Sequence, residues 1–569
     1  MALAEKWLPR SITSLGTYSA KQFGSDLGSG ITVGLVALPL AMAFGIASGV
    51  TPQAGLYTAV VAGFLISALG GSRVQIGGPT GAFVVIVAGI VARFGTAGLA
   101  LVTLLAGVLL VIMGISGLGS AVKFIPRPVI IGFTNGIALL IASTQIKDFL
   151  GLKTGPVPSS FLPRMKVLVA NLGTVAWPAV AVASLTLAII LLWPRLDRRV
   201  PGSILAVLSA TALSVALDLR VETIGSRFGG IPQGLPPLTL PHLNSVSILP
   251  LLPSAFTVAM LGAIESLLSA VVADSMSGDR HNSNVELIAQ GVANLASPLF
   301  GGIPATGAIA RTATNIRSGA RTPVSGIVHA LTLLGILLAA APLARFIPLA
   351  ALAAVLFVVA WNMGEWREIG SILRLSKADI AVWAVTFLLT VIADLTLAVG
   401  VGMALAALLY ILRIAETTTV APVTEEYLQD GKVHILQDKE IPPNVAILRI
   451  HGPFLFGTTQ KLEDATENLG GLPSIVILRL RNMTAIDATG VHAIERFAER
   501  LRRTGRMLLV CGARDQPAEL LARSEFVDDV GRENILPNVE SALARARTIG
   551  ASFSGVGPEI AHDMLSMKI

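Results

Sequence analysis

A short turn with the residue types of an anion site occurs twice in this chain, at positions roughly 225 residues apart. Each copy places threonine, glycine and alanine soon after a proline, inside otherwise apolar sequence. Small residues let the backbone approach a ligand closely, and proline is tolerated where a helix begins. Two helix N-termini that face each other would sum their partial positive charges and attract an anion. The copies are Gly77-Gly78-Pro79-Thr80-Gly81-Ala82 and Gly301-Gly302-Ile303-Pro304-Ala305-Thr306-Gly307-Ala308.

The expected donors are the backbone N–H groups that follow each proline, if helices begin near Thr80 and Thr306. Arg311 would then lie between one and two turns inside the second helix, where its guanidinium attracts a dianion and binds it by charge-assisted hydrogen bonds. Two alternatives stay open: the turns merely reverse the chain between spans, or Arg311 only pairs with Glu265. The predicted donor residues are Thr80, Gly81, Ala82, Thr306, Gly307 and Ala308.

One carboxyl group stands out as a candidate for ion coupling. Glu265 interrupts the apolar run from Phe256 to Val272, and Ser269 follows four residues later on the same helix face. A carboxyl group inside an apolar span is by default a functional site, and it can carry a proton, whereas sodium needs several hard oxygen ligands. The sequence therefore favours proton coupling through Glu265 and Ser269. The alternative is a carboxylate that stays paired with Arg311 and never titrates.

The elements that position these residues are predicted to be membrane-spanning helices. Of the 569 residues, 53% are hydrophobic and 14% are charged, with a mean hydropathy of +0.74, which is too apolar for an ordinary soluble protein of this length. Apolar runs that are long enough to cross a bilayer recur between about Ile31 and Ile414. We expect about fourteen spans, seven in each repeat, with the second repeat inverted. Further landmarks keep the same register: Thr32-Val33 returns as Thr257-Val258, and Phe124-Ile125-Pro126 returns as Phe346-Ile347-Pro348.

Charged residues predict the topology. The positive-inside rule favours cytoplasmic loops at three basic clusters and places both termini in the cytoplasm, and we expect no removable signal peptide. Basic loops at Lys153/Arg164/Lys166 and at Arg345 oppose this orientation. The net charge of +7 mostly reflects topology, and no basic stripe with interleaved aromatic residues indicates nucleic-acid binding. The favourable clusters are Lys123/Arg127, Arg195/Arg198/Arg199 and Arg367/Arg374/Lys377.

After Arg413 the apolar runs end and a small soluble α/β domain with a mostly parallel sheet is predicted. The expected strands are Val445–Ile450, Ser474–Leu480 and Arg506–Cys511, and the expected helices are Gln460–Leu469, Gly490–Arg503, Glu519–Arg523 and one from Glu540 onward. The predicted domain limits are 1–25 for a cytoplasmic N-terminal segment, 26–415 for the transmembrane domain with repeats 26–220 and 250–415, 416–440 for a linker, 441–550 for the α/β domain and 551–569 for a tail.

Several of these segments resemble the sulfate permease (SulP) family of anion transporters. The resemblance implies seven plus seven inverted helices in a core and a gate domain, an elevator-like movement of the core, a bacterial inner membrane and a homodimer. A similarity to the bacterial C4-dicarboxylate branch is indicated by Ala259–Leu268 and Thr144–Leu152. The α/β part, with Ile486-Asp487-Ala488-Thr489-Gly490, resembles a STAS domain. The strings that carry the family resemblance are Val36-Ala37-Leu38-Pro39-Leu40-Ala41-Met42-Ala43-Phe44-Gly45, Gly78-Pro79-Thr80-Gly81, His281-Asn282-Ser283-Asn284-Val285-Glu286-Leu287 and Phe300-Gly301-Gly302-Ile303-Pro304.

The resemblance also implies roles for individual residues. Phe44 and Phe83 match aromatic positions that flank the anion in relatives, although either ring could be plain packing. In sodium-coupled bicarbonate members, Asp and Thr stand where this chain has Glu265 and Ser269, and a second Thr stands at Ile309, so that one hydroxyl ligand is lost here. Thr489 matches the loop where anti-sigma factor antagonists accept phosphate, which implies a regulatory phosphorylation site. A simple N-cap role for Thr489 is the alternative.

The function expected from these observations is secondary active anion transport, with a proton as the co-transported ion and sulfate or a related oxyanion as the substrate. The seven histidines show no metal-ligand spacing, the single Cys511 cannot form an internal disulfide, and no Walker loop or hydrolase elbow is present. We therefore expect no metal, no cofactor and no enzyme activity. The expected partners are a small anion, a proton, membrane lipid and a second copy of the chain. Alternatives are a C4-dicarboxylate or bicarbonate carrier, an anion channel or voltage-driven motor, and a membrane-anchored signalling module.

Overall fold

The computed structural model describes residues 7–16, 18–120, 126–197, 201–234, 238, 247–393, 395–423, 440–465 and 472–554. The chain divides into two compact units, Met1–Ala406 and Ala407–Ile569, which we call the membrane unit and the α/β unit. The domain limits expected at 415 and 441 stay predictions. Several residues used above lie outside the described ranges, namely Lys123, Phe124, Ile125, Arg198, Arg199, most of the linker 416–440 and the end of the tail 551–569.

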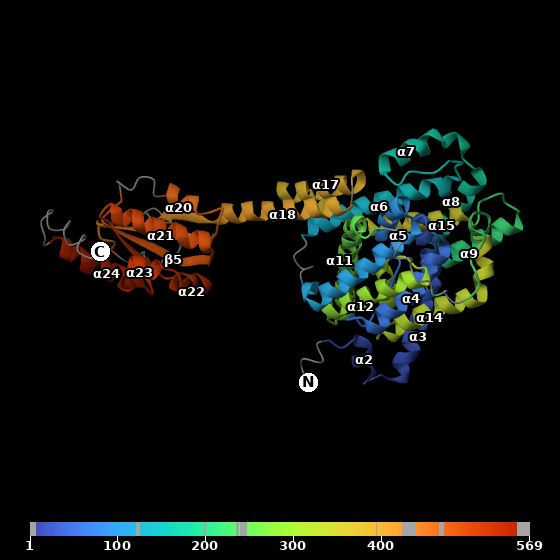
Figure 1. Ribbon diagram of the computed structural model, residues 1–569, viewed down its shortest axis with the longest axis horizontal. Helices are drawn as coiled ribbons and strands as arrows, with labels where there is room; N and C mark the ends of the chain where they lie inside the picture. The colour runs from blue at the N-terminus through green and yellow to red at the C-terminus, as the bar shows by residue number, and fades with distance from the viewer. Residues whose placement is uncertain are drawn as a thin grey trace. The chain divides into compact units, whose positions relative to one another are not determined.

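The membrane unit is a bundle of apolar helices (Figure 1). Nine helical segments among the described residues are long and apolar enough to cross a membrane, so the predicted helical membrane class is confirmed. The number of fourteen spans stays a prediction, since α5 bends at Gly95 (φ 68°, ψ −175°) and thus joins two segments. The longer helices are α3 (Ala20–Ala47), α4 (Pro52–Leu69), α5 (Gly81–Ile115), α6 (Arg127–Leu150), α8 (Trp177–Leu196), α9 (Gly202–Ala216), α11 (Leu252–Ser277), α12 (Ser283–Ala296), α14 (Val324–Ala340), α15 (Leu349–Met363), α17 (Lys377–Ile392) and α18 (Leu395–Thr417). The shorter ones are α2 (Arg10–Leu15), α7 (Phe161–Ala170), α10 (Ile224–Phe228), α13 (Ile309–Arg317) and α16 (Trp366–Ile372), with 3₁₀ turns at Leu172–Thr174, Leu249–Leu251, Ser297–Phe300 and Ala341–Phe346.

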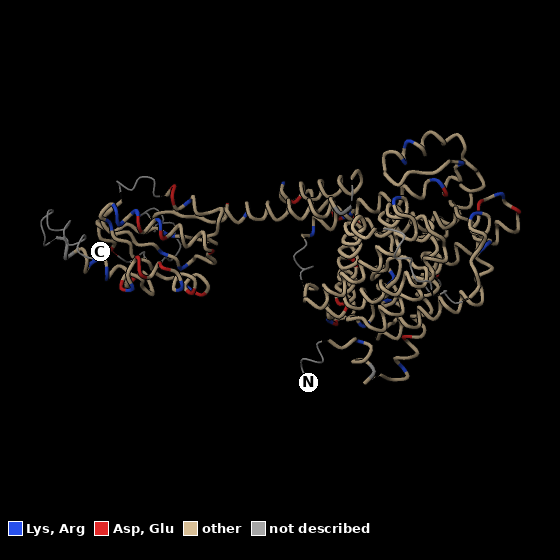
Figure 2. Tube along the Cα trace, viewed as in Figure 1, with Lys and Arg blue, Asp and Glu red and all other residues tan. Residues whose placement is uncertain are grey.

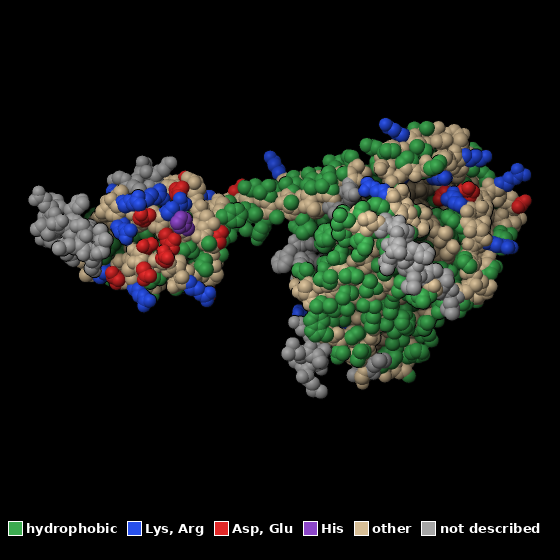
Figure 3. Space-filling model, viewed as in Figure 1, with side chains coloured by type: hydrophobic (Ala, Val, Ile, Leu, Met, Phe, Trp, Pro, Cys, Tyr) green, Lys and Arg blue, Asp and Glu red, His purple; other side chains and the backbone are tan. Residues whose placement is uncertain are grey.

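The outer surface of the membrane unit is apolar. Figure 3 shows hydrophobic side chains in a broad continuous area on the visible face of this unit, and Figure 2 shows few charged residues along its helices. Large apolar side chains such as Trp177, Leu196 and Trp361 are mostly exposed. Such exposure is costly in water and favourable in lipid, so these faces are suited to contact the bilayer.

The helix contacts form two groups. In the first group, α3 packs against α4 and α14, and α5 packs against α11 and α12. In the second group, α6 packs against α15 and α17, and α8 packs against α9 and α15. The contacts of α3 with α14 and of α5 with α12 join the first predicted repeat to the second. This exchange across the repeats is the pairing expected of a duplicated and inverted unit.

The two turns that recur in the sequence meet as a short antiparallel ladder. Strand β1 (Gly77–Gly78) pairs with β2 (Thr306–Gly307), with Gly77 opposite Gly307 and Gly78 opposite Thr306. All four residues are buried, so each repeat supplies the backbone partners of the other. Gly78 has φ +140°, and a Cβ on Gly307 would lie 1.8 Å from Gln75 Nε2. Glycine is therefore required here by backbone conformation and by close approach.

The α/β unit contains the sheet order β3-β4-β5-β6-β7, in which β3 is antiparallel to β4 and the other pairs are parallel. The mostly parallel sheet is as predicted, whereas β7 and β3, which lies in the segment expected to be a linker, were not predicted. Helices α21 to α23 cover one face of the sheet and α24 covers the other. Cys511 is buried, and this burial raises the pKa of its thiol to about 11, although nearby Arg479 opposes the shift. The elements are β3 (Thr419–Pro422), β4 (Val445–Phe454), α20 (Gln460–Asp464), β5 (Ile475–Ile486), α21 (Ala488–Arg503), β6 (Met507–Cys511), α22 (Asp515–Arg523), α23 (Phe526–Val530), the 3₁₀ turn Arg532–Asn534, β7 (Ile535–Leu536) and α24 (Val539–Ser554).

Several predicted bounds in the α/β unit are wrong: α21 begins at Ala488 rather than Gly490, and α20 ends at Asp464, before the expected Leu469. Strands β4 and β5 run four and six residues further than expected, to Phe454 and Ile486, because they continue to pair with each other after the apolar runs end. Helix α22 begins at Asp515 rather than at Glu519, since Pro517 is tolerated in a first helical turn. Residues 466–469 of the helix expected up to Leu469 lie outside the described ranges.

We predict that Gly78→Ala destabilises the membrane unit by about 1–3 kcal/mol, because the new Cβ would occupy a positive-φ position and would lie 2.7 Å from Arg311 Nη1. The matched control is Gly335→Ala on α14, where a Cβ meets no atom within 4 Å. Thermal unfolding of the purified proteins in detergent is the measurement. Equal midpoints for Gly78→Ala and Gly335→Ala would contradict the requirement for glycine in the ladder.

Candidate anion site

Two helices begin beside the ladder. Helix α5 starts at Gly81 with Thr80 as its N-cap residue, and α13 starts at Ile309 with Ala308 as its N-cap residue. The first backbone bonds run from Phe83 N–H to Thr80 O (3.3 Å) and from Thr312 N–H to Ala308 O (2.8 Å). The N–H groups of Gly81 and Ala82, and those of Ile309 and Ala310, therefore precede the hydrogen-bonded part of each helix and are available to a ligand.

The helix start expected near Thr306 is wrong. Thr306 and Gly307 form β2, the Thr306 hydroxyl donates to Gly262 O (3.0 Å), and Ala308 N–H donates to Ile76 O (2.8 Å). The ladder therefore takes up the residues that were expected to begin the helix, and neither Pro79 nor Pro304 occupies a first helical position. Sequence reasoning missed Ile309 and Ala310, although Ile303 and Ala305 make the second turn two residues longer than the first.

Arg311 lies in the first turn of α13 and joins the two copies of the turn. Its side chain is 3% exposed, Nη1 donates to Gly77 O at 3.5 Å, and Nη2 donates to Pro79 O. Among the described residues, no carboxylate oxygen lies within ion-pair distance of this guanidinium, so the expected alternative of a direct Arg311–Glu265 pair is wrong. The two charges attract each other at longer range. Arg311 therefore brings a full positive charge to the ladder while its donors hold backbone carbonyls.

Glu265 of α11 faces the start of α5. Its side chain is 9% exposed, and Oε2 accepts a hydrogen bond from the Thr80 hydroxyl at 2.8 Å. Ser269 does not join this contact: its Oγ lies 3.2 Å from Thr312 Oγ1, which also accepts from Ile76 N–H at 3.0 Å. The two residues of the expected ion-coupling pair thus support different parts of the site, and their role in coupling stays a prediction.

The two predicted aromatic residues are both buried, but they contact different parts of the bundle. A Cβ on Gly81 would lie 3.4 Å from Phe44 Cε1, 3.3 Å from Met363 Sδ and 3.0 Å from Ile141 Cδ1, so these side chains surround the start of α5. Phe83 instead packs beside Gly262 within the buried core. Ile141 and Met363 belong to α6 and α15, so the start of α5 lies where the two helix groups meet. The contribution of Phe44 and Phe83 to substrate binding stays a prediction.

A polar brace that the sequence analysis missed fixes the ladder to α11. Gln75 Nε2 donates to Ser266 Oγ at 3.0 Å and to Ser266 O at 3.2 Å, and it lies against Gly307. Asn294 adds a second support, because it donates to Ala305 O (2.8 Å) and accepts from Ala305 N–H (2.9 Å). The signal in the sequence is a polar amide two residues before the glycine pair in an apolar segment.

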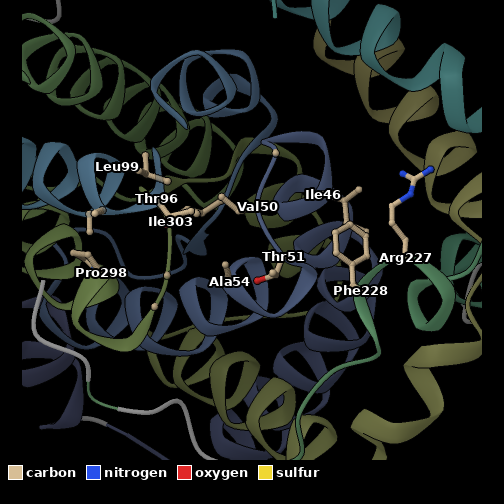
Figure 4. Close-up of a pocket in the computed structure, with 15 residues that line it drawn as sticks. Ile46, Val50, Thr51, Ala54, Thr96, Leu99, Arg227, Phe228, Pro298 and Ile303 are labelled. Carbon is tan, nitrogen blue, oxygen red and sulfur yellow. The ribbon is translucent and has the colours of Figure 1, made fainter. Parts of the chain in front are cut away.

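A cavity of about 630 Å³ lies elsewhere in the membrane unit (Figure 4). Figure 4 shows Ile46 and Phe228 side by side at one end of the group and Thr96, Leu99 and Ile303 toward the other. Its charged lining residue, Arg227, already binds Asp148 through both Nη atoms at 2.8 and 3.1 Å and also contacts Glu222. Thr80, Glu265 and Arg311 do not line this cavity, so it is separate from the candidate anion site.

In the α/β unit, the structure corrects the expected alternative for Thr489. The N-cap residue of α21 is Asp487, whose Oδ1 accepts from Gly490 N–H (2.8 Å) and whose Oδ2 accepts from Phe456 N–H (3.0 Å). Thr489 lies in the first turn of α21 and is exposed. The N-cap explanation for Thr489 is therefore wrong, and phosphorylation of this residue stays a prediction.

We predict that Asp487→Ala destabilises the α/β unit by about 1 kcal/mol, because Gly490 N–H at the start of α21 and Phe456 N–H after β4 lose their acceptor. Thr489→Ala is the matched control, and it should have little effect because its side chain is exposed. The rate at which a thiol reagent modifies the buried Cys511 in increasing urea reports unfolding of this unit alone. Indistinguishable urea midpoints for the two variants would refute the assignment of the cap to Asp487.

Comparison with known proteins identifies the families that match the two units of the chain. The model of the sulfate permease family matches residues 23–386, and the model of the STAS domain matches residues 437–542. A Bacillus subtilis protein named "Putative sulfate transporter YvdB" is 44% identical over 519 residues, which cover 91% of this chain and 96% of that protein. The bicarbonate transporter BicA of Picosynechococcus is 33% identical over 536 residues, which cover 92% of this chain and 94% of BicA.

Solved structures agree with this placement. The transmembrane domain of a cyanobacterial bicarbonate transporter BicA is 33% identical and superposes with a TM-score of 0.62, covering 68% of this chain and 98% of that domain. The murine Solute Carrier 26 family member A9 anion transporter in its inward-facing state is 20% identical and has a TM-score of 0.85, covering 96% of this chain and 95% of that one, which shows a shared fold. The chain therefore belongs to the sulfate permease family of multi-pass membrane anion transporters and carries a C-terminal STAS domain.

Proposed function

We propose that this protein is a secondary active transporter that moves sulfate, or a closely related oxyanion, together with a proton. The observation that carries the proposal is the meeting of the α5 and α13 N-termini at the β1–β2 ladder, with the Arg311 guanidinium between them. Backbone N–H groups and one guanidinium supply positive potential without a metal, which suits an anion whose oxygens accept several hydrogen bonds.

Residues at the start of α13 are exposed while the rest of the site is buried, which supports entry of the anion at α13. Thr80, Gly81, Ala82, Thr306 and Gly307 are buried. In contrast, Ile309 is 39% exposed and Ala310 is also exposed, although Arg311 next to them is buried. The start of α13 is thus an open side of an otherwise closed site, and an anion bound there would reach the free N–H groups directly.

The names of the relatives indicate which candidate substrates to favour. Sulfate comes first, because the relative that is 44% identical is named for sulfate. Bicarbonate is the second candidate, because BicA is 33% identical over nearly the full chain. Both anions present negatively charged oxygens to the same donors, and a C4-dicarboxylate does so as well. Competition among the three anions distinguishes these candidates.

Electrostatics of Glu265 support coupling to a proton. An ionised Glu265 offsets the positive charge of Arg311 and occupies the Thr80 hydroxyl, so it opposes binding of an anion. A proton on Glu265 removes this negative charge and restores the net positive potential of the site. Proton and anion then bind with positive cooperativity, which is the thermodynamic requirement of a symporter.

The position of the site supports an elevator-type movement. The start of α5 carries donors on one helix group and contacts Ile141 and Met363 of the other group. A displacement of one group along the other would carry the donors and Arg311 together, because the ladder fixes them to each other. The site would then change the side from which it is open while its internal geometry is preserved.

The proposal further places the chain in a bacterial inner membrane as a homodimer, with both termini in the cytoplasm. One of the basic residues that opposed this orientation, Arg164, is 3% exposed and donates to Ser143 Oγ (2.8 Å) and Pro158 O (3.2 Å). A buried and hydrogen-bonded arginine has a structural role, so it counts less toward the charge of a loop. This weakens the opposing pattern and supports cytoplasmic termini.

We predict that the wild-type protein in proteoliposomes accumulates radiolabelled sulfate when the outside is more acidic than the inside. In Glu265→Gln, the carboxyl that changes charge is gone, so the pH gradient should no longer accelerate uptake, with a loss of about tenfold or more in the gradient-driven part. Sulfate-for-sulfate exchange should persist. Excess bicarbonate, succinate and fumarate are tested as competitors in the same assay.

The matched control is Glu368→Gln, because Glu368 forms a peripheral ion pair with Arg127 at 2.9 Å. This variant should follow the pH gradient as the wild type does. Sulfate uptake by Glu265→Gln that still follows the gradient fully would disprove coupling through Glu265. Failure of the wild type to carry or bind any of the tested anions would disprove the proposed function itself.

A further inference from the structure

A histidine that the sequence analysis left unassigned lies inside the membrane unit. His329 of α14 has 0% exposure, and neither Nδ1 nor Nε2 makes a hydrogen bond of normal geometry among the described residues, although the Gly326 backbone one turn earlier acts on the ring. Buried polar atoms in folded proteins are nearly always hydrogen-bonded to protein or to ordered water. An imidazole that only filled space would be better replaced by an apolar side chain, so the unpartnered ring atoms indicate a role beyond packing.

The imidazole lies beside the candidate anion site. A Cβ on Gly63 of α4 would be 3.6 Å from His329 Cε1, 3.8 Å from its Nδ1 and 3.1 Å from Gly77 O. Gly77 O in turn accepts from Arg311 Nη1. The ring, the first carbonyl of the ladder and the guanidinium are thus gathered around Gly63. The absence of a side chain on Gly63 is what allows this approach.

Two further buried side chains with polar atoms unpartnered in the described part of the chain, Ser67 and Asn315, lie one helical turn from residues of this cluster. One turn along the same helices, Ser67 Oγ lies against Gly326, where a Cβ would be only 2.1 Å away, and Ser67 Oγ has no partner within the described ranges. Asn315 lies one turn after Arg311. Its Oδ1 also has no hydrogen-bond partner within the described ranges, while its Nδ2 donates to Ser325 Oγ at 2.8 Å. Water is the usual partner of such clustered buried atoms.

The polar atoms lead to a buried carboxylate near the start of α3. Ser325 Oγ donates to Thr322 O (3.0 Å), and the Thr322 hydroxyl donates to Asp26 Oδ2 (2.6 Å). The Tyr18 hydroxyl also donates to Asp26 Oδ2 (3.0 Å), and Tyr18 is partly exposed. We call this series the polar track; its members are Tyr18, Asp26, Thr322, Ser325, Asn315, Ser67 and His329.

We propose that His329 is a second proton-binding residue of the transporter, and that the polar track carries its proton from the Asp26 end when an anion binds near Arg311. The inference rests on the proposed function. In the step, a hydronium ion at the Asp26 end transfers a proton along hydrogen-bonded water and hydroxyl groups, a ring nitrogen of His329 gains an N–H bond, and water is left behind. Release is the reverse step.

The charges around His329 explain why the two ligands bind together. Three elements pack against α14, namely α3, α4 and the 3₁₀ turn Ala341–Phe346, and α13 lies nearby. Their titratable or charged residues are Lys21 and Asp26 on α3, Tyr57 on α4, Arg345 in the 3₁₀ turn, and Arg311 and Arg317 on α13. Arg311 and the His329 ring both lie near Gly77 O, so the positive guanidinium repels an imidazolium. Glu265 attracts Arg311 at longer range. An anion bound at Arg311 offsets this repulsion, so it favours the proton on His329.

The test measures protons taken up when sulfate binds to the full-length protein in detergent. Sulfate is added in weakly buffered solution near neutral pH, and a pH indicator reports the uptake while calorimetry reports the bound anion. The wild type should take up protons, and His329→Gln should take up fewer, by as much as about one proton per chain. Correspondingly, the rise in sulfate affinity on acidification should be shallower in His329→Gln.

His492→Gln is the matched control, because His492 is an exposed imidazole on α21 and its loss should leave proton uptake unchanged. His329→Asn serves in the same assay if His329→Gln does not fold. Thr322→Val interrupts the track, so it should slow proton uptake in a stopped-flow measurement while sulfate affinity is retained.

Equal proton uptake by the wild type and by the folded His329 variant would overturn the inference, even if Glu265→Gln showed a deficit. Sulfate binding by the wild type without any proton uptake would overturn both the inference and proton coupling. A wild type that binds none of the tested anions would remove the proposed function on which the inference rests. These outcomes separate failure of the His329 assignment from failure of the transporter assignment.

Discussion

The structure of the membrane unit depends on how a backbone that leaves the helical conformation satisfies its hydrogen bonds inside an apolar bundle. Water is scarce at that depth, so every exposed N–H and C=O group there is costly. The β1–β2 ladder solves this for both repeats at once, since Gly77 and Gly78 pair with Gly307 and Thr306. Among the neighbouring groups, Ile76 N–H donates to the Thr312 hydroxyl, and the Arg311 guanidinium donates to Gly77 O and Pro79 O. The candidate anion site is what remains after these needs are met, namely the first turns of α5 and α13.

The ladder also explains why a buried arginine is tolerated without a direct carboxylate partner. The Arg311 donors hold carbonyls of the turn that precedes α5, which fixes the cation in place and stiffens the turn. Among the described residues, Glu265 compensates its positive charge at longer range, and Glu265 itself accepts a hydrogen bond from the Thr80 hydroxyl. A site in which a cation and a carboxylate are close but not paired retains net potential for a ligand, whereas a closed ion pair would not.

The sequence was sufficient for the class of protein, the duplicated turn and the two charged residues beside it, because composition, internal repetition and charges in apolar runs are local properties. It was insufficient for contacts that depend on pairing between distant segments. The start of α13 at Ile309 follows from the ladder, which no single-segment pattern indicates. The hydroxyl of Ser269 meets Thr312 rather than Glu265 for the same reason. In the α/β unit, the helix starts at Ala488, two residues before the expected Gly490, so the cap falls on Asp487, and aspartate before a helix is a strong cap signal.

A fixed site of this kind raises a difficulty for release, because N–H groups and a guanidinium do not change their charge at physiological pH. An anion that binds tightly on one side of the membrane would stay bound on the other unless the free energy of binding changes between the two states. Under the proposed proton coupling, titratable neighbours would provide such a change. Glu265 approaches the donors of α5 directly, and His329 approaches the carbonyl that Arg311 holds. A proton lost from either group lowers the net positive potential at Arg311, so in the proposed mechanism deprotonation on the side of higher pH would weaken anion binding where the anion is to be released.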